Sequence, residues 1–187
     1  MLFRSHGLSS TPEMIILKDR DITSNWMVYH SAIGNTKHLR LDLTASEYTT
    51  STRWNNTSPT SSVFTLGNDS SVNGDSANED LIAYCFHSVA GYSKVGSYKA
   101  NQSTDGVFVY CGFTPQMVII KNVSRSQEWI ISDSVRDDTN PASLSLSPNS
   151  SGAEGSGNDI DYVSNGFKIR ASGGGINYAS GDTMIFI

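Results

Sequence analysis

The apolar residues of this chain occur in short runs separated by polar turns. Residues 14–17 and 117–120 are continuous apolar runs that follow a proline, which is typical of central strands buried on both faces. Residues 38–43 alternate instead, so their leucines should face a core while Arg40 and Asp42 face water or a second surface. No segment keeps apolar residues at helical spacing over three turns, so we expect essentially no helix.

Several other segments have the pattern of strands. Residues 26–30 and 129–132 each begin with tryptophan after a polar turn, and we expect them to form hairpins with the two central strands. The remaining expected strands are 63–66, 81–86, 167–170 and 183–187, and the end of another strand lies in 1–10.

The two halves of the sequence repeat each other. Residues 11–18 return as 114–121, and Trp26 returns as Trp129, both at a spacing of 103 residues. The match needs no gap over about seventy residues, which indicates a tandem duplication whose loop lengths are fixed by packing or whose origin is recent. Residues 91–98, which precede the second copy, have no counterpart ahead of the first.

Two copies of about six short strands each predict an all-β protein, an antiparallel sandwich of the jelly-roll or concanavalin-like kind. We expect the first repeat in residues 1–90 and the second in residues 91–187. The link between them is short and aromatic, unlike a flexible linker, so we expect the repeats to pack as one compact unit. Whether each copy closes its own sandwich or both contribute to one stays open.

The composition limits the kinds of partner. A net charge of −5 with 17% charged residues argues against non-specific binding of nucleic acid and against attraction to anionic membranes. No stretch approaches the roughly 20 apolar residues that span a bilayer, and residues 1–10 lack the pattern of a signal peptide. We therefore expect neither membrane insertion nor export.

The motifs of common catalytic sites are missing. The sequence has no Gly-x-Ser-x-Gly, Walker loop, His-Glu-x-x-His or Cys-x-x-Cys, and carboxylates such as Glu47, Asp159 and Asp161 form no recognisable pair. Cys85 and Cys111 lie at the edges of apolar runs, and buried free thiols are favoured over a disulfide. We expect no enzymatic activity.

One segment resembles a calcium loop. Residues 69–80 place Asp69, Asn73 and Asp80 at positions 1, 5 and 12, and Asp75 also offers a carboxylate. Position 8 is Ser76 instead of an apolar residue, and strands rather than helices flank the segment. An acidic hairpin loop with Asn-Gly turn chemistry is therefore favoured, with a surface calcium ion as the alternative and no other cofactor expected.

One aromatic residue is a candidate for ligand binding. Trp54 lies in a polar loop beside Asn55 and Asn56, has no aromatic counterpart in the second copy, and could bind a ligand together with Tyr48. The alternative is that it caps the edge of the sandwich. The duplicated Trp26 and Trp129 are expected to pack in the core.

The repeated Thr-Pro-x-Met motif with its tryptophan, together with residues 58–67, 82–86, 89–98 and 164–170, resembles a β-rich domain in large virion proteins of marine tailed phages. The resemblance covers almost the whole chain. Members of that family are described as tail fibre or other phage structural proteins and tend to be longer, which leaves open whether this chain is a fragment or a small virion protein.

The resemblance implies a virion structural protein of tail-fibre or receptor-binding type, located on the tail or the capsid surface. We expect it to contact other virion proteins, to form a homo-oligomer and to present polar loops, with a host-surface glycan as a further candidate partner. A capsid decoration protein is the alternative from the same particle. A lectin-like glycan-binding module, aided by calcium or not, is the alternative from another class.

Overall fold

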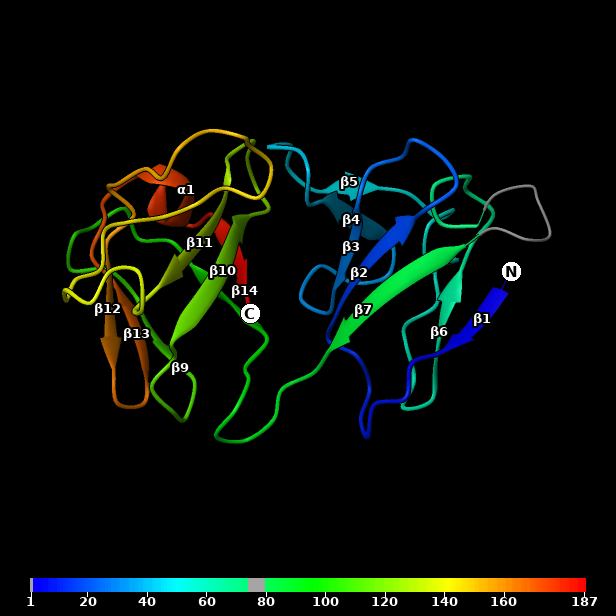
Figure 1. Cartoon of the computed structure of the whole chain (residues 1–187), viewed down its shortest axis with the longest axis horizontal. Coiled ribbons are helices and arrows are strands. Elements are labelled where there is room, and N and C mark those ends of the chain that lie inside the picture. Colours follow the sequence, from blue (N-terminus) through cyan, green and yellow to red (C-terminus); the bar gives the residue numbers. More distant parts are fainter. Residues whose placement is uncertain (1, 74–79) are drawn as a thin grey trace. The chain divides into compact units, whose positions relative to one another are not determined.

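A computed structural model describes residues 2–73 and 80–187 and is built almost entirely of antiparallel strands (Figure 1). The expected all-β sandwich class is confirmed. The chain divides into two compact units, one comprising residues 1–42 and 47–88 and the other residues 43–46 and 89–187. This boundary lies close to the one expected at residue 90, and the packing of the two repeats as one compact unit stays a prediction.

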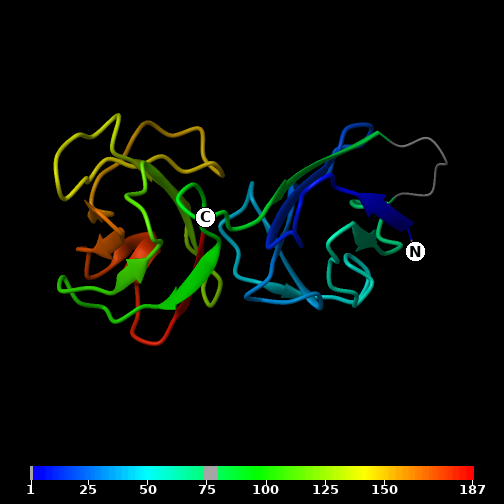
Figure 2. The ribbon, with the colours of Figure 1, turned by 90° about the horizontal axis from the view of Figure 1, so that it is seen from below.

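The first unit has two sheets. The larger has the order β5-β4-β3-β2-β7, and the smaller is the ribbon β1-β6. Figure 2 shows this ribbon as a separate layer from β2 and β7. The strands are β1 (Leu2–Ser5), β2 (Met14–Asp19), β3 (Met27–His30), β4 (Lys37–Arg40), β5 (Tyr48–Thr49), β6 (Val63–Leu66) and β7 (Leu81–Phe86).

The second unit also has two sheets, with the orders β11-β10-β14-β8 and β12-β13-β9. A single helical turn, α1 (Gly174–Asn177), precedes the last strand. The strands are β8 (Gly96–Lys99), β9 (Phe108–Tyr110), β10 (Met117–Asn122), β11 (Trp129–Asp133), β12 (Ile160–Val163), β13 (Gly166–Ile169) and β14 (Thr183–Phe186).

Both expected central strands are confirmed. β2 pairs with β3 and β7, and β10 pairs with β11 and β14, so each has a partner on both sides. The expected alternation in residues 38–43 holds only in part, because β4 ends at Arg40. Leu39 is fully buried, whereas Leu41 and Leu43 beyond the strand are half-buried.

The strand registers agree with the spacing of the sequence repeat. Met14 lies opposite His30 and Phe86 in the first unit. Residues 103 positions later, Met117 and Asp133, lie opposite each other in the second unit. Asp19 and Asn122, related by the same spacing, each accept backbone N–H bonds from the residues two and three positions later. The duplication itself stays a prediction, which these matched contacts support.

Each unit has its own hydrophobic core, formed by apolar side chains from its two sheets. In the first unit Leu17, Phe64 and Leu66 belong to this core. In the second unit the residues at the repeat spacing, Ile120, Phe167 and Ile169, belong to the core, which also contains Tyr98 of β8.

Candidate functional site

The first unit contains a groove of about 430 Å³ beside strand β7. Leu81, Ala83 and Cys85 of β7 form one wall, and Phe64 and Leu66 of β6 form another. The remaining lining residues are Leu17 at the base and the polar Arg4, Ser5, His6 and Asp80. The groove is therefore lined by both apolar and polar residues, and Leu17, Phe64 and Leu66 among them are almost fully buried.

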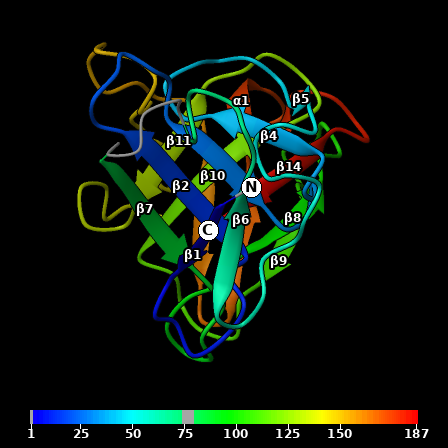
Figure 3. The same ribbon diagram turned by 90° about the vertical axis from the view of Figure 1, so that its right-hand side faces the viewer.

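Strand β7 presents an unpaired backbone edge to this groove. It is the outermost strand of its sheet, and β2 is its only strand partner within residues 2–73 and 80–187 (Figure 3). The backbone N–H of Arg20 donates to the Asp80 carbonyl at 2.9 Å. Because antiparallel pairing alternates, the N–H and C=O groups of Leu81, Ala83 and Cys85 then point to the outer edge.

In the second unit the corresponding edge is covered. Residues 103 positions after Leu81 and Ala83 are Met184 and Phe186 of β14, which lie opposite Tyr98 and Gly96 of β8. The N–H of Ala100 donates to the Asp182 carbonyl at 2.9 Å, so the same alternation directs the backbone of Met184 and Phe186 to β8. Strand β8 thus occupies the place that is a groove in the first unit.

Tyr98 fills the core next to β14. Its ring lies edge-on to Phe167 with centroids 6.4 Å apart, and its hydroxyl donates to the carbonyl of Ile176 at 2.7 Å. Burial raises the pKa of this hydroxyl well above its usual value, so it stays protonated as a donor. The residue at the place of Phe167 in the first unit, Phe64, also belongs to its unit's core and is 2% exposed, and it borders the groove.

The size of one side chain differs between the two places. Phe186 is 4% exposed, and a Cβ atom on Gly96 would come within 2.9 Å of its ring. Glycine at position 96 therefore leaves room for Phe186. The counterpart of Phe186 in the first unit is Ala83, whose short side chain leaves more space in the groove.

Trp54, the candidate for ligand binding or for capping the sandwich edge, lies in the interior of the first unit. Its side chain is 2% exposed, packs edge-on against Tyr29 with ring centroids 5.7 Å apart, and donates from Nε1 to the Lys37 carbonyl at 3.1 Å. Trp54 therefore belongs to the core, because its ring fills the interior and its N–H has a backbone acceptor there. Asn55 is half-buried and Asn56 is exposed, both with positive φ angles of 52° and 48°.

Tyr48 lies in a different cluster, on β5. Its ring stacks on His38 with centroids 5.2 Å apart, and the guanidinium carbon of Arg40 lies over the Tyr48 ring, 4.3 Å from its centroid. His38 is 2% exposed, and neither ring nitrogen has a hydrogen-bond partner in the described part of the chain. Burial, with Arg53 and Arg40 nearby, lowers the pKa of His38 to about 4.

The residues of the expected calcium loop are engaged elsewhere. The Asp69 carboxylate forms an ion pair with Arg53 and accepts a bond from the Ser71 hydroxyl at 2.6 Å. The Asn73 amide donates to the Gly67 carbonyl, and Asp80 faces Arg20 at 4.0 Å. Asp75 lies outside the described residues. In the described ranges no three His, Cys, Asp or Glu side chains form a metal-binding group, and calcium binding stays a prediction.

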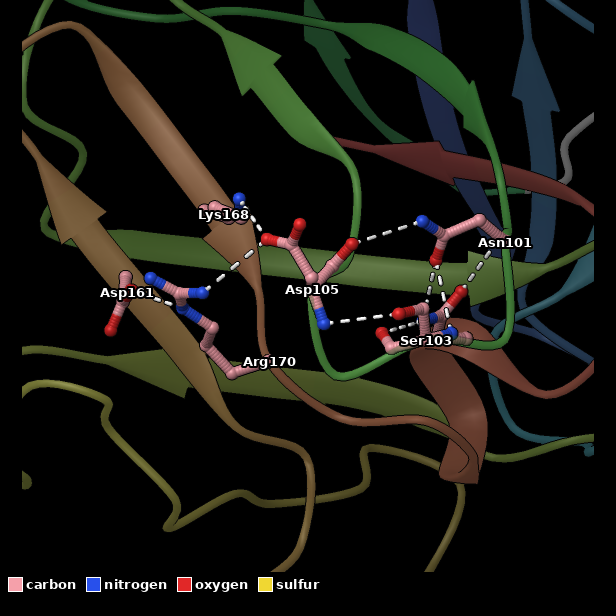
Figure 4. A network of polar contacts seen from close by, with 7 residues as sticks. Asn101, Ser103, Asp105, Asp161, Lys168 and Arg170 are labelled. Carbon is pink, nitrogen blue, oxygen red and sulfur yellow. Dashed lines mark hydrogen bonds and ion pairs between the residues drawn. The ribbon is translucent and has the colours of Figure 1, made fainter.

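A charged network lies on the second unit (Figure 4). Asp105 binds Lys168 at 2.5 Å and lies 3.7 Å from Arg170, which also pairs with Asp161. The hydrogen bond from Lys168 and its charge lower the pKa of the Asp105 carboxyl. The Asp105 carbonyl also accepts a bond from Asn101 at 3.2 Å. The two acidic and two basic groups are thus paired, and the pair of Asp105 with Lys168 holds the loop that contains Asp105 against β13. Asp161 is paired with Arg170 and is therefore not a free catalytic acid.

Sequence reasoning did not identify the groove. Residues 91–98, which contain most of β8, supply the strand that covers β14 in the second unit. Cys85 at this edge is a free thiol, half-buried, and burial raises its pKa to about 11.

The chain belongs to a family defined as a domain of unknown function, DUF7483, whose model matches residues 3–187. Searches of curated proteins and of solved structures found no match. No helix of the described residues is long and apolar enough to cross a membrane.

Proposed function

We propose that this protein is a non-enzymatic structural and binding module of a phage virion, of the tail-fibre or receptor-binding type. The virion context rests on the resemblance of the repeated motifs to phage structural proteins. The observation that carries the binding role is the groove beside β7, where an apolar wall adjoins an unpaired strand edge. This combination suits a polypeptide partner better than a small polar substrate.

The polar residues of the molecule support a structural rather than a catalytic role. The acidic residues of the two clusters described above are paired with arginine or lysine, as in the pairs of Asp69 with Arg53 and Asp161 with Arg170. A general acid or base needs an accessible group near a substrate cavity. The groove offers His6, Asp80 and the thiol of Cys85, whose pKa is raised to about 11 by burial, so this thiol is a weak nucleophile near neutral pH.

Several exposed aromatic side chains also support protein contacts. Tyr92 is 81% exposed and Tyr110 is 64% exposed, and aromatic residues of this kind are enriched at protein interfaces. Other virion proteins are therefore the proposed partners. We also propose a homo-oligomer, for which light scattering should give a mass above 20.3 kDa. A monomer at working concentration would contradict this part of the proposal.

Immunogold electron microscopy of the phage particle tests the location. Antibody raised against this chain should label the tail or its fibres. Label spread over the head would identify a capsid decoration protein instead, and this would overturn the tail-fibre assignment while keeping the virion role. A particle that contains none of this chain by mass spectrometry would overturn the virion role altogether.

A further inference from the structure

We propose that a polar groove on the second unit binds a short neutral saccharide through the carboxylate of Glu128 and the amide and hydroxyl groups around it. This polar groove measures about 320 Å³ and is lined by residues within 127–130, 145–158 and 174–175. It is separate from the groove beside β7. The inference therefore goes beyond the binding role proposed above, and it depends neither on that role nor on the location of the protein in a virion.

The polar groove lies where the first unit has larger side chains. Two of its lining residues, Ser156 and Gly175, are found 103 positions after Arg53 and Val72. In the first unit Val72 is 0% exposed and belongs to the core, and the Arg53 side chain is 11% exposed and pairs with Asp69. Serine and glycine are too short to fill the same space. The polar groove therefore arises from a difference in side-chain size within the unit.

Hydrogen bonds within the second unit hold the walls of the polar groove in place. The backbones of Ser145 and Gly155 exchange two hydrogen bonds of 2.9 and 3.0 Å. The Asn158 amide donates to the Ser145 hydroxyl at 3.2 Å, and its side-chain carbonyl accepts from the backbone N–H of Gly175, also at 3.2 Å. A site that is ordered before the ligand arrives loses less conformational entropy on binding.

Several polar groups of the polar groove are available to a ligand. One carboxylate oxygen of Glu128 accepts a hydrogen bond from the Asn149 amide, and the other has no hydrogen-bond partner in the described part of the chain. The side chains of Gln127, Ser147 and Ser156 likewise form no hydrogen bond within residues 2–73 and 80–187. Together these groups supply both donors and acceptors.

The chemistry of the lining selects the class of ligand. The described residues that line the polar groove include no lysine, arginine or histidine, so an anion such as phosphate finds no charged partner. Their only apolar side chains are those of Ile130 and Ala153, which is too little apolar surface for a lipophilic ligand. A carboxylate with amides and hydroxyls suits the hydroxyl groups of a sugar, which both donate and accept. The volume is near the lower end of the range of about 300–1,000 Å³ for ligand sites, so the saccharide is short.

A titration of the isotopically labelled full chain, followed by amide NMR signals, tests this proposal. The probes are the neutral disaccharides maltose, lactose and chitobiose, with choline and inorganic phosphate as cationic and anionic controls. We expect saturable binding of at least one disaccharide, which perturbs the amides of Gly155, Gly174 and Gly175 and leaves those of β7 unchanged. No saturable binding of any of the three disaccharides, or tighter binding of choline or phosphate, would overturn the proposal.

A variant that fills the polar groove tests the place of binding. Ser156→Arg introduces the side chain that Arg53 has in the first unit, and it should weaken disaccharide binding by about tenfold or more. Ser151→Arg adds the same side chain to the same loop, at an exposed residue that does not line the polar groove, and should leave the affinity unchanged. Equal affinities of the two variants would contradict binding in the polar groove.

A second variant tests the carboxylate. Glu128→Gln keeps an acceptor for the Asn149 amide but removes the charge, and it should weaken binding by about tenfold because hydrogen bonds to charged groups are stronger. Asp138→Asn, at an exposed carboxylate outside the polar groove, is the matched control. Affinity in Glu128→Gln equal to that of the wild type would overturn the role of Glu128. None of these outcomes depends on where antibody labels the virion, so this proposal and the proposed function can fail separately.

Discussion

Tyr98 and Phe167, from different sheets of the second unit, meet edge-on with ring centroids 6.4 Å apart, and Phe167 meets Phe186 in the same manner at 5.3 Å. Three aromatic rings thus connect β8, β13 and β14. In the first unit Phe64 corresponds to Phe167, but the counterpart of Phe186 is Ala83. No strand in the described part of the first unit supplies an equivalent of Tyr98. The two units therefore differ where the groove lies.

Tyr98→Ala should destabilise the second unit by about 3–5 kcal/mol, because it removes a buried aromatic ring from the core. Tyr98→Phe keeps the ring but leaves the Ile176 carbonyl without its 2.7 Å donor, which should cost about 1–2 kcal/mol. Urea denaturation followed by tryptophan fluorescence measures both changes. Tyr92→Ala serves as the control at a site 81% exposed, and a loss there as large as in Tyr98→Ala would contradict the assigned role.

Trp54→Ala should lower the free energy of unfolding of the first unit by about 3–5 kcal/mol, because the ring is 2% exposed and its N–H bonds to the Lys37 carbonyl. Thermal denaturation measures the effect, with Tyr110→Ala as an exposed aromatic control. A variant that keeps its stability but loses binding to a glycan would contradict this core role and support the ligand-binding role considered from the sequence.

Stability should fall as the solution is acidified from pH 6.5 to about 4, in part through His38. Its pKa in the folded chain is lowered to about 4 by burial and by two arginines, whereas the unfolded chain has the ordinary value near 6.5. Between these values the unfolded state binds the proton more readily, so acid favours unfolding. The full effect of this residue is about 3 kcal/mol, present above pH 6.5 and lost by pH 4.

The variant His38→Phe tests this account, since it keeps an aromatic ring to stack on Tyr48 and removes the titrating group. Denaturant melts at several pH values should show a shallower dependence than in the wild type. His87→Gln, at a half-buried histidine outside this cluster, is the matched control. An unchanged pH dependence in His38→Phe would show that other groups cause the acid instability.

The sequence predicted most of the strands because their patterns are strong. Continuous apolar runs identified β2 and β10, and tryptophan after a polar turn identified β3 and β11. Strands β8, β9 and β12 are short and mix polar with apolar residues, so their formation depends on partners distant in the chain. Sequence patterns do not report those partners.

The candidate site was less predictable for the same reason. Trp54 in a polar loop was a candidate for ligand binding or for capping the sandwich edge, whereas its ring lies in the core and its N–H bonds to the Lys37 carbonyl. The groove depends on a difference between the two units, and on a strand edge whose neighbours are far away in sequence. Only the register of the paired strands places Ala83 opposite the position that Gly96 fills in the other unit.

Residue-resolved amide hydrogen exchange tests the central claim, that the outer edge of β7 is open while that of β14 is covered. We predict that the outward amides of Leu81, Ala83 and Cys85 exchange at least about tenfold faster than the inward amides of Ile82 and Tyr84. Met184 and Phe186 should be as well protected as Ile185, because β8 covers them. Uniform protection along β7 would contradict the claim, because it would show that another segment already occupies this edge.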